Sequence, residues 1–147
     1  MDLVTGGTGI VGAHVLLELT MTGKPVRALA RPKSDRTILT RIFKHYQPDR
    51  VDELLSRINW FEGDLDSPGA LEDAMVGVRN VYHAAAMISF DPRDARTMHK
   101  VNVEGTANVV NAALIAGITR LCFVSSIAAI GEAPGHVERD ETLPWSA

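Results

Sequence analysis

The sequence lacks the residues that disulfides and zinc sites require. Its one cysteine, Cys122, has no partner for an internal disulfide, and there is no cysteine pair or His-Glu-x-x-His segment to bind zinc. The five histidines show no ligand spacing, so we expect no metal. His83 lies in an apolar run and is expected to be a buried core residue, and Cys122 is expected to act as a small hydrophobic residue.

Long apolar runs and an excess of basic charge are also missing. No stretch of about 18 apolar residues occurs, so we expect no membrane span. The 15 basic and 18 acidic residues give a net charge of -3, which does not favour nucleic acid as a partner, because that binding requires a clustered basic surface. Met1 is followed by an acidic residue and glycines rather than by the basic start of a secretion signal. A cytoplasmic protein is therefore expected.

What the chain does contain is ordinary globular composition. Of the 147 residues, 46% are hydrophobic and 22% are charged, which is typical of a folded domain that buries a real core. We expect residues 1–147 to form one domain. There is no internal repeat; instead, short apolar runs alternate with segments of helical periodicity.

This alternation predicts strands and helices in turn. The expected strands cover residues 2–5, 26–30, 58–61, 81–84 and 121–125, and the expected helices cover 9–20, 36–46, 51–58, 69–76 and 94–116. Such an order favours β-α-β units and a doubly wound parallel sheet. The last strand is almost wholly apolar, which is typical of a strand covered on both faces. Because such a sheet usually has at least one more strand, we expect the front part of a longer protein.

A glycine-rich loop joins the first strand to the first helix. In Thr5-Gly-Gly-Thr-Gly-Ile-Val-Gly12, glycines 6, 9 and 12 fit G-x-x-G-x-x-G, and glycines 7, 9 and 12 fit G-x-G-x-x-G. Glycines at this spacing allow a tight turn and a close approach of the backbone to a pyrophosphate at the helix N-terminus. A plain glycine-rich turn is the alternative, but the strand-loop-helix context favours a dinucleotide site.

The end of the second strand bears on which dinucleotide is bound. An acidic residue there would hold the ribose of NAD, whereas an arginine accommodates the 2′-phosphate of NADP. This strand ends in Arg31, and no acid occurs before Asp35. NADP is therefore favoured, with NAD as the alternative. Arg31 could also be a solvated strand end without a ligand.

Five motifs in order give the chain a wider resemblance. They are TGGTGIVG from Thr5, GDL at 63–65, HAAA at 83–86, VNVEGTANVV at 101–110 and FVSSIAAIG at 123–131. The sequence resembles the extended branch of the short-chain dehydrogenase/reductase superfamily over essentially its whole length. That branch has a Rossmann-type fold and includes nucleoside-sugar epimerases and dehydratases, dihydroflavonol reductases and 3β-hydroxysteroid dehydrogenases. The second strand, VRALARP, is more similar to the reductases than to the epimerases.

The resemblance implies cofactor-binding roles at the matching positions. Three segments are involved: the loop with Gly6, Gly9, Ile10, Val11 and Gly12; then Asp64 and Leu65 at the adenine end; and then Ala84, Ala85 and Ala86, where small side chains let the cofactor lie against the backbone. Two alternatives stay open. Asp64 could be a turn-capping residue, and the alanines could serve close packing of a strand against a helix.

The resemblance also implies two residues that act near the substrate. Ser126 would hydrogen-bond the substrate oxygen at the end of the fifth strand, and Asn102 would support the hydrogen bonds of the active site. A solvent-facing Asn102 is one alternative. The neighbouring Ser125 is another, although strand alternation would point the two serines in opposite directions.

One feature of the resembled family is missing. Its catalytic Tyr-x-x-x-Lys pair does not occur, because Tyr46 and Tyr82 are followed four residues later by Arg50 and Ala86. That pair lies downstream in the family, so the 147 residues are expected to bind cofactor but to turn over substrate poorly.

The function expected is the cofactor-binding portion of an NAD(P)-dependent oxidoreductase that acts on a small carbonyl compound or secondary alcohol. A nucleoside-sugar epimerase or dehydratase is one alternative, and a non-catalytic dinucleotide-sensing module is another. The long helix at 94–116 suggests a homodimer. Its stripe of small residues could equally be the face that covers the sheet.

Overall fold

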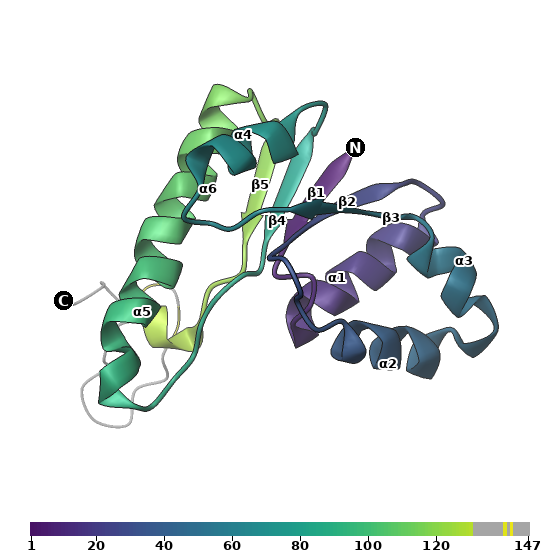
Figure 1. Ribbon diagram of the computed structural model, residues 1–147, viewed down its shortest axis with the longest axis horizontal. Helices are drawn as coiled ribbons and strands as arrows, with labels where there is room; N and C mark the ends of the chain where they lie inside the picture. The colour runs from purple at the N-terminus through teal and green to yellow at the C-terminus, as the bar shows by residue number, and fades with distance from the viewer. Residues whose placement is uncertain (131–139, 141, 143–147) are drawn as a thin grey trace.

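The computed structural model describes residues 1–130, 140 and 142. Its centre is a parallel sheet of five strands in the order β3-β2-β1-β4-β5 (Figure 1). The strands are β1 (Asp2–Thr5), β2 (Val26–Ala30), β3 (Ile58–Glu62), β4 (Asn80–His83) and β5 (Arg120–Phe123). The chain moves outward from β1 to β3 and then crosses back to β4 beside β1. This reversal is the point at which doubly wound sheets bind ligands.

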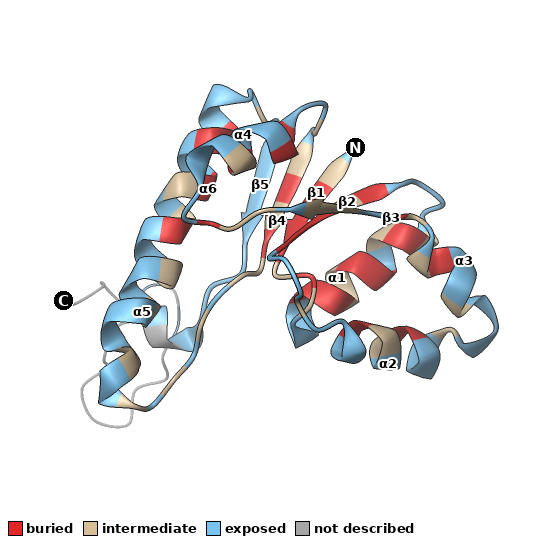
Figure 2. Ribbon diagram, viewed as in Figure 1, coloured by how far each residue is buried: buried red, intermediate tan, exposed pale blue. Residues whose placement is uncertain are grey.

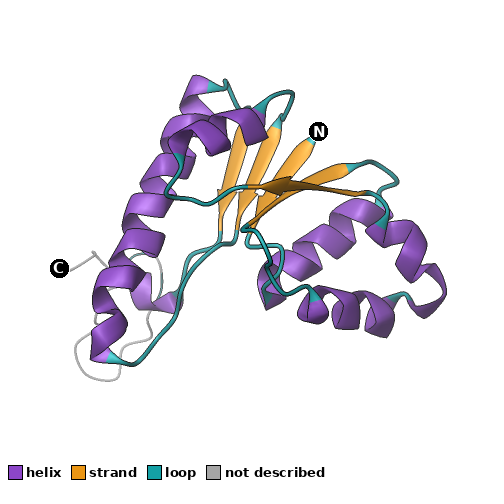
Figure 3. Cartoon of the chain, viewed as in Figure 1, coloured by secondary structure: helices purple, strands orange, loops and turns teal. Residues whose placement is uncertain are grey.

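Helices lie on both sides of this sheet (Figure 3). One side has α1 (Ile10–Met21), α2 (Thr37–Tyr46) and α3 (Val51–Leu55), and a 3-10 turn at Pro48–Arg50 leads into α3. The other side has α4 (Pro68–Met75), α5 (Ala95–His99) and α6 (Gly105–Ile115). A 3-10 turn, Pro92–Asp94, precedes α5, and a π-helical turn, Lys100–Glu104, joins α5 to α6. The long helix expected at 94–116 is therefore present, but it is not α-helical throughout.

Strand alternation divides the core into two clusters. Leu3 packs on the side of α4 and α6, together with Val81 and Val109, whereas Val4 packs on the side of α1 and α2, together with Leu16 and Phe43. Neighbouring residues of β1 thus face opposite layers, as the period of a strand requires. All of these side chains are buried, and Figure 2 shows buried residues on the strands of the sheet and on the helices packed against it.

The stripe of small residues on the long helix faces inward. Gly105, Val109 and Ala112 are buried, and the last two belong to the core cluster that includes Leu71 of α4 and Val81 of β4. The alternative that this face covers the sheet is therefore confirmed for the middle of the stripe. The opposite face of α6 has its own exposed apolar side chains, Val110 and Leu114 among them.

One expectation about local structure is wrong for the described part of the chain. All four residues of β5 are exposed, because β5 lies at the edge of the sheet and pairs there with β4 alone (Figure 2). Its apolar sequence is thus not covered on both faces. Ser67 occupies the N-cap of α4, but its side chain makes no capping hydrogen bond, and Pro68 at the first turn starts the helix instead.

None of the described helices is both long and apolar enough to cross a membrane. Likewise, the described residues include no group of three or more histidine, cysteine or acidic side chains placed to hold a metal ion.

Candidate cofactor site

The glycine loop folds back on itself before α1 begins. Gly6 has a φ of +73°, which favours glycine, and a Cβ there would lie 2.6 Å from the backbone of Ala84. A Cβ on Gly12 would collide with the carbonyl of Gly6. Both glycines are therefore required by the packing of the loop. Gly9 is different, because its added Cβ would meet only the carbonyl oxygen of Gly6, at an ordinary 3.4 Å.

The N-terminus of α1 is left open toward solvent. Gly9 is the N-cap residue, no side chain caps the helix, and its first turn has no acidic residue. Backbone N–H groups at such an end attract an anion, and the helix dipole adds to this attraction. Ile10 and Val11 lie in this first turn with exposed side chains, and their backbone N–H groups are among those that the helix itself leaves without a partner.

A cavity of about 640 Å³ lies at the carboxyl ends of four strands. It runs from the end of β2 across the glycine loop to the segment after β4. The lining includes most of the expected cofactor residues: Gly6, Gly9, Arg31, Asp64, Leu65, Ala84, Ala85 and Ala86. Ile10, Val11 and Gly12 are not part of the lining. Sequence reasoning missed Thr5, Ser34, Met87 and Ile88, which also line it.

The end of this cavity beside β2 and β3 is built from two turns. Arg31 follows β2 and is exposed; its carbonyl accepts a hydrogen bond from the N–H of Ser34 at 3.1 Å, which closes a turn that has Lys33 at a φ of +62°. After β3, Asp64 Oδ1 accepts the N–H of Leu65 at 2.7 Å. The turn-capping interpretation of Asp64 is therefore confirmed. It leaves the position of Asp64 in the cavity lining unchanged.

The long helix holds the Asp64 turn from behind. Asn108 donates to the carbonyl of Leu65 at 2.9 Å, and Lys100 pairs with Asp66 at 2.7 Å. This pairing lowers the pKa of the Asp66 carboxyl and raises the pKa of Lys100, chiefly through the hydrogen bond between them. A Cβ on Gly105 would lie only 3.0 Å from that of Leu65. The helix and the turn are thus packed closely.

Asn102 belongs to the π-helical turn and reaches the segment after β4. Its amide nitrogen donates to the carbonyl of Met87, and its amide oxygen accepts the N–H of Met87, both at 2.8 Å. The solvent-facing alternative for Asn102 is therefore wrong. Single π-helical turns within helices are frequent at functional sites, and this one places Asn102 where it supports the cavity wall.

Ser125 and Ser126 both follow β5 rather than lie within it. Both are exposed, and the carbonyl of Ser126 accepts the N–H of Ala129 in the 3-10 turn Ile127–Ala129. Strand alternation therefore cannot decide between the two serines, because the strand ends at Phe123. Ser126 does not line the cavity as the described residues form it. Gly131, the last residue of the motif FVSSIAAIG, lies outside the described residues.

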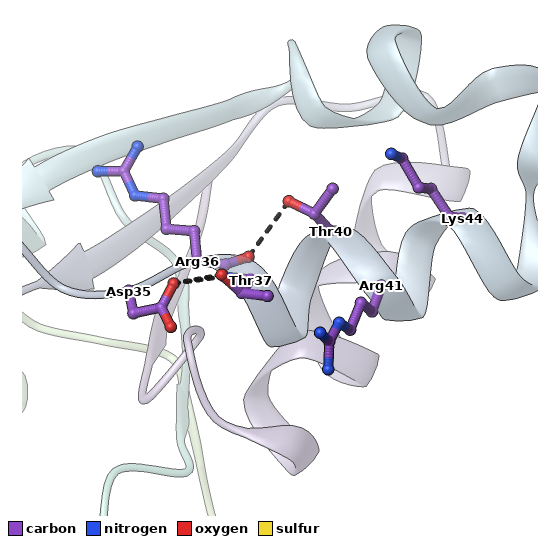
Figure 4. Close-up of a pocket in the computed structure, with 6 residues that line it drawn as sticks. All are labelled: Asp35, Arg36, Thr37, Thr40, Arg41 and Lys44. Carbon is purple, nitrogen blue, oxygen red and sulfur yellow. Dashed lines mark hydrogen bonds between the residues drawn. The ribbon is translucent and has the colours of Figure 1, made fainter.

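A more open hollow of about 460 Å³ lies at the start of α2 and shares no residue with the cavity (Figure 4). Asp35 there accepts hydrogen bonds from Thr37, chiefly from its hydroxyl at 2.6 Å, and these lower the pKa of Asp35. The three basic side chains point in different directions, and the guanidinium of Arg36 lies 3.9 Å from the ring centroid of Trp60. The hollow is the surface of a capped helix start and offers no converging cations.

Comparison with known proteins assigns the family. The model of the NAD dependent epimerase/dehydratase family matches residues 3–147. The chain belongs to this family. Its five-stranded parallel sheet with helices on both sides is the Rossmann fold of that family.

Individual relatives cover both reductases and epimerases. The chain is 37% identical over 139 residues to a protein of Synechocystis named "Putative dihydroflavonol 4-reductase". The matched region is 95% of this chain and 36% of that protein. The 3 beta-hydroxysteroid dehydrogenase type 7 of Rattus norvegicus is 30% identical over 99% of the chain and 42% of that protein. The chain thus spans about two fifths of the length of these relatives.

Solved structures agree with this assignment. The crystal structure of gox2253 superposes with a TM-score of 0.80 at 39% identity, over 99% of this chain and 40% of that one. The UDP-glucose 4-epimerase of Thermus thermophilus, in complex with NAD, superposes with a TM-score of 0.75 at 27% identity, over 99% of this chain and 44% of that one.

Proposed function

We propose that this chain is the dinucleotide-binding portion of an NAD(P)-dependent oxidoreductase that acts on a carbonyl compound or a secondary alcohol. The observation that supports this most is the open N-terminus of α1 above a cavity that runs from Arg31 to Met87. The glycine loop would hold the pyrophosphate, Asp64 and Leu65 would contact the adenine end, and Ala84 to Ala86 would lie against the rest. When bound, the cofactor supplies hydride chemistry at its nicotinamide.

The cofactor proposed is NADP. Arg31 lines the cavity where the second strand ends, and the turn from Arg31 to Ser34 contains no acid. A guanidinium there would bind the 2′-phosphate through charge-assisted hydrogen bonds. NAD is the competing choice, and it is the cofactor named with the Thermus thermophilus epimerase. Calorimetric titration of the chain with NADPH and NADH tests both; tighter binding of NADH would reject the proposal for NADP, and no binding of either would reject the function.

The substrate we propose is a carbonyl compound with an apolar body rather than a sugar nucleotide. Ile88, which lines the cavity, and Phe90, two residues beyond it, have 82% and 98% of their surface exposed, and such apolar groups suit an apolar ligand. Ser126 would hydrogen-bond the substrate oxygen, and Asn102 would support the site by fixing Met87. The epimerase alternative is tested by assaying a longer chain, extended through a downstream Tyr-x-x-x-Lys, with UDP-glucose beside a panel of apolar ketones and aldehydes.

We also propose a homodimer through the outer face of the long helix. Val103, Val110 and Leu114 are exposed there, while Gly105 and Ala112 of the same helix are already buried in the core. A second copy that packs on this face would remove apolar surface from water. Light scattering of Leu114→Glu against the parent chain tests this, because a charge in the interface shifts the chain to monomer. The cytoplasmic location stays a prediction.

A further inference from the structure

A buried hydrogen-bond network connects the glycine loop to the end of β4. His83, the last residue of β4, is fully buried; its Nδ1 lies 2.6 Å from the hydroxyl of Thr5, and its Nε2 lies 3.0 Å from the hydroxyl of Thr106. The Thr5 hydroxyl oxygen also accepts the N–H of Ala85 at 3.3 Å. Phe123 stacks against the imidazole, with 5.5 Å between ring centroids. Three strands and α6 therefore meet at one histidine.

The contacts of Thr5 assign the tautomer of this histidine. The Thr5 hydroxyl oxygen already accepts the N–H of Ala85, and Nδ1 of His83 lies 2.6 Å from it, so we assign the tautomer in which the Thr5 hydroxyl donates to Nδ1. In this tautomer Nδ1 is unprotonated and Nε2 donates its proton to Thr106. A doubly protonated ring would direct a second donor at the Thr5 oxygen and leave the Thr5 hydroxyl proton without an acceptor. Burial acts in the same direction and lowers the pKa of His83.

The network lies where two walls of the cavity meet. Thr5 and Ala85 both line the cavity, and Gly6, directly after Thr5, is packed on the backbone of Ala84 and Ala85. The Thr5 hydroxyl donates a hydrogen bond to His83 and accepts one from the N–H of Ala85, so it connects the glycine loop to both residues. The distance between the glycine loop and the end of β4 therefore depends on a neutral ring that accepts at Nδ1.

We propose that His83 is a positioning residue for the dinucleotide: through the Thr5 hydroxyl it holds the glycine loop against the end of β4 in the geometry that binds cofactor. It touches no cofactor atom itself, since it is fully buried and does not line the cavity. The inference rests on the proposed dinucleotide binding and adds a residue that the motifs mark only as a core histidine.

Paired variants of the full chain test this role. Thr5→Val keeps the shape of the side chain but removes the hydroxyl, and we expect roughly tenfold weaker NADPH binding, because the hydrogen bond to Nδ1 and the order of the loop are lost together. Thr5→Ser restores the hydroxyl and should bring affinity back to within about threefold. Thr20→Val is the matched control: Thr20 is equally buried and hydrogen-bonds Leu17, but it lies at the far end of α1.

Two histidine variants separate the two sides of the ring. The amide oxygen of His83→Asn stands near the position of Nδ1 and can accept from Thr5, whereas the amide of His83→Gln extends to the position of Nε2 and reaches Thr106. We expect His83→Asn to bind NADPH more tightly than His83→Gln. The opposite order, or weakening by Thr20→Val equal to that by Thr5→Val, overturns the proposal.

A third measurement depends on neither folding of the variants nor cofactor. Nitrogen-15 NMR of the parent chain reports the tautomer of His83, and a protonated Nδ1 overturns the proposal. If the parent chain binds neither NADPH nor NADH, the proposed function fails. The inference is then judged by this tautomer and by amide hydrogen exchange of residues 6–9, which should be faster in Thr5→Val than in Thr20→Val.

Discussion

Single residues of the glycine loop differ in what a side chain would disturb. At Gly12 an added Cβ meets the carbonyl of Gly6 inside the protein, and at Gly6 it meets the backbone of Ala84. At Gly9 the backbone is extended, with φ of -89° and ψ of 172°, and the space outside is open. Substitutions at Gly6 and Gly12 therefore act on folding, whereas substitutions at Gly9 act on the ligand.

Gly9→Val should abolish dinucleotide binding in a chain that still folds. The branched side chain occupies the space above the first turn of α1, where the pyrophosphate would approach, and costs only about 1 kcal/mol as a poorer N-cap. Gly12→Ala is the contrasting variant and should lower the free energy of unfolding by about 1–3 kcal/mol through overpacking. Calorimetry with NADPH and urea unfolding measure the two effects. Normal cofactor binding by Gly9→Val would mean that the loop is only a turn.

Arg31→Ala should weaken NADPH binding about ten- to a hundredfold and leave NADH binding almost unchanged. The expected loss is one charge-assisted interaction with the 2′-phosphate, worth about 1.5–3 kcal/mol. Arg120→Ala is a suitable control, because Arg120 is also exposed but starts β5, at the opposite end of the strand from the cavity. Equal losses for the two dinucleotides in Arg31→Ala would contradict the assignment of the phosphate site.

At the level of elements, periodicity predicted most of the fold. Strands β1 and β2 and helices α1 and α4 lie within one or two residues of the ranges expected. Gly23, Gly77 and Gly117, which follow α1, α4 and α6, have positive φ, as is typical of glycines that end helices. Of the candidate site, the sequence predicted Gly6 and Gly9 of the loop, Arg31 and the Ala84 segment, which the structure brings to one cavity, whereas Gly12 lies outside the lining.

The remaining elements depend on contacts that no local pattern encodes. The exposure of β5 follows from its place at the edge of the sheet, since an apolar run reads alike at an edge and at the centre. The π-helical turn at Lys100–Glu104 arises where Asn102 and Lys100 hold two separate loops. The network of Thr5, His83 and Thr106 joins residues far apart along the chain, so spacing could not reveal it.

Asn102→Ala should loosen the segment after β4 without unfolding the protein. The change removes both hydrogen bonds to Met87 and leaves its N–H and carbonyl to water, at a cost of about 1–3 kcal/mol. Hydrogen exchange at the Met87 amide should become faster, and NADPH binding should weaken. Asn111→Ala is the control, since Asn111 is exposed on α6. Unchanged exchange at Met87 would show that the amide pair does not order this segment.

Across the whole molecule, the free energy of unfolding should decrease in two separate pH ranges as the solution becomes more acidic. Burial holds the folded-state pKa of His83 below its ordinary value of about 6.5, so the unfolded chain takes up a proton first as pH falls. The free energy of unfolding should therefore decrease below about pH 6.5, by at most about 1.4 kcal/mol per pH unit, until the folded-state pKa is reached. Asp35, Asp66 and Asp91 have lowered pKa values, so their contribution is lost only below about pH 4.

Replacing the histidine separates these windows. In His83→Asn, the free energy of unfolding should stay constant between about pH 6.5 and 5, whereas that of the parent chain decreases over the same range. The loss below about pH 4 should remain in both proteins. Urea unfolding at half-unit pH steps measures both limbs. The same slope above pH 5 in the variant and the parent would assign that limb to other groups.

Catalysis is the property for which the 147 residues should be insufficient. Tyr46 lies exposed on α2 against His14, and Tyr82 packs in the core beside α1 and α2, so neither lines the cavity as a proton donor. No lysine follows either tyrosine at four residues. General acid–base catalysis contributes about 10²–10⁴-fold, and we expect hydride transfer by this chain to be near background even with NADPH bound.

The decisive experiment compares this chain with a longer one that extends through a downstream Tyr-x-x-x-Lys. For each chain, NADPH oxidation is measured with a panel of carbonyl compounds. Calorimetry on both should give similar dinucleotide affinities, because Gly9, Arg31 and Asp64 are common to both chains. Turnover should occur only in the longer chain and fall again on Ser126→Ala, since the serine would hydrogen-bond the substrate oxygen. Comparable turnover by the 147-residue chain would contradict this prediction, because a group within it would then supply the proton.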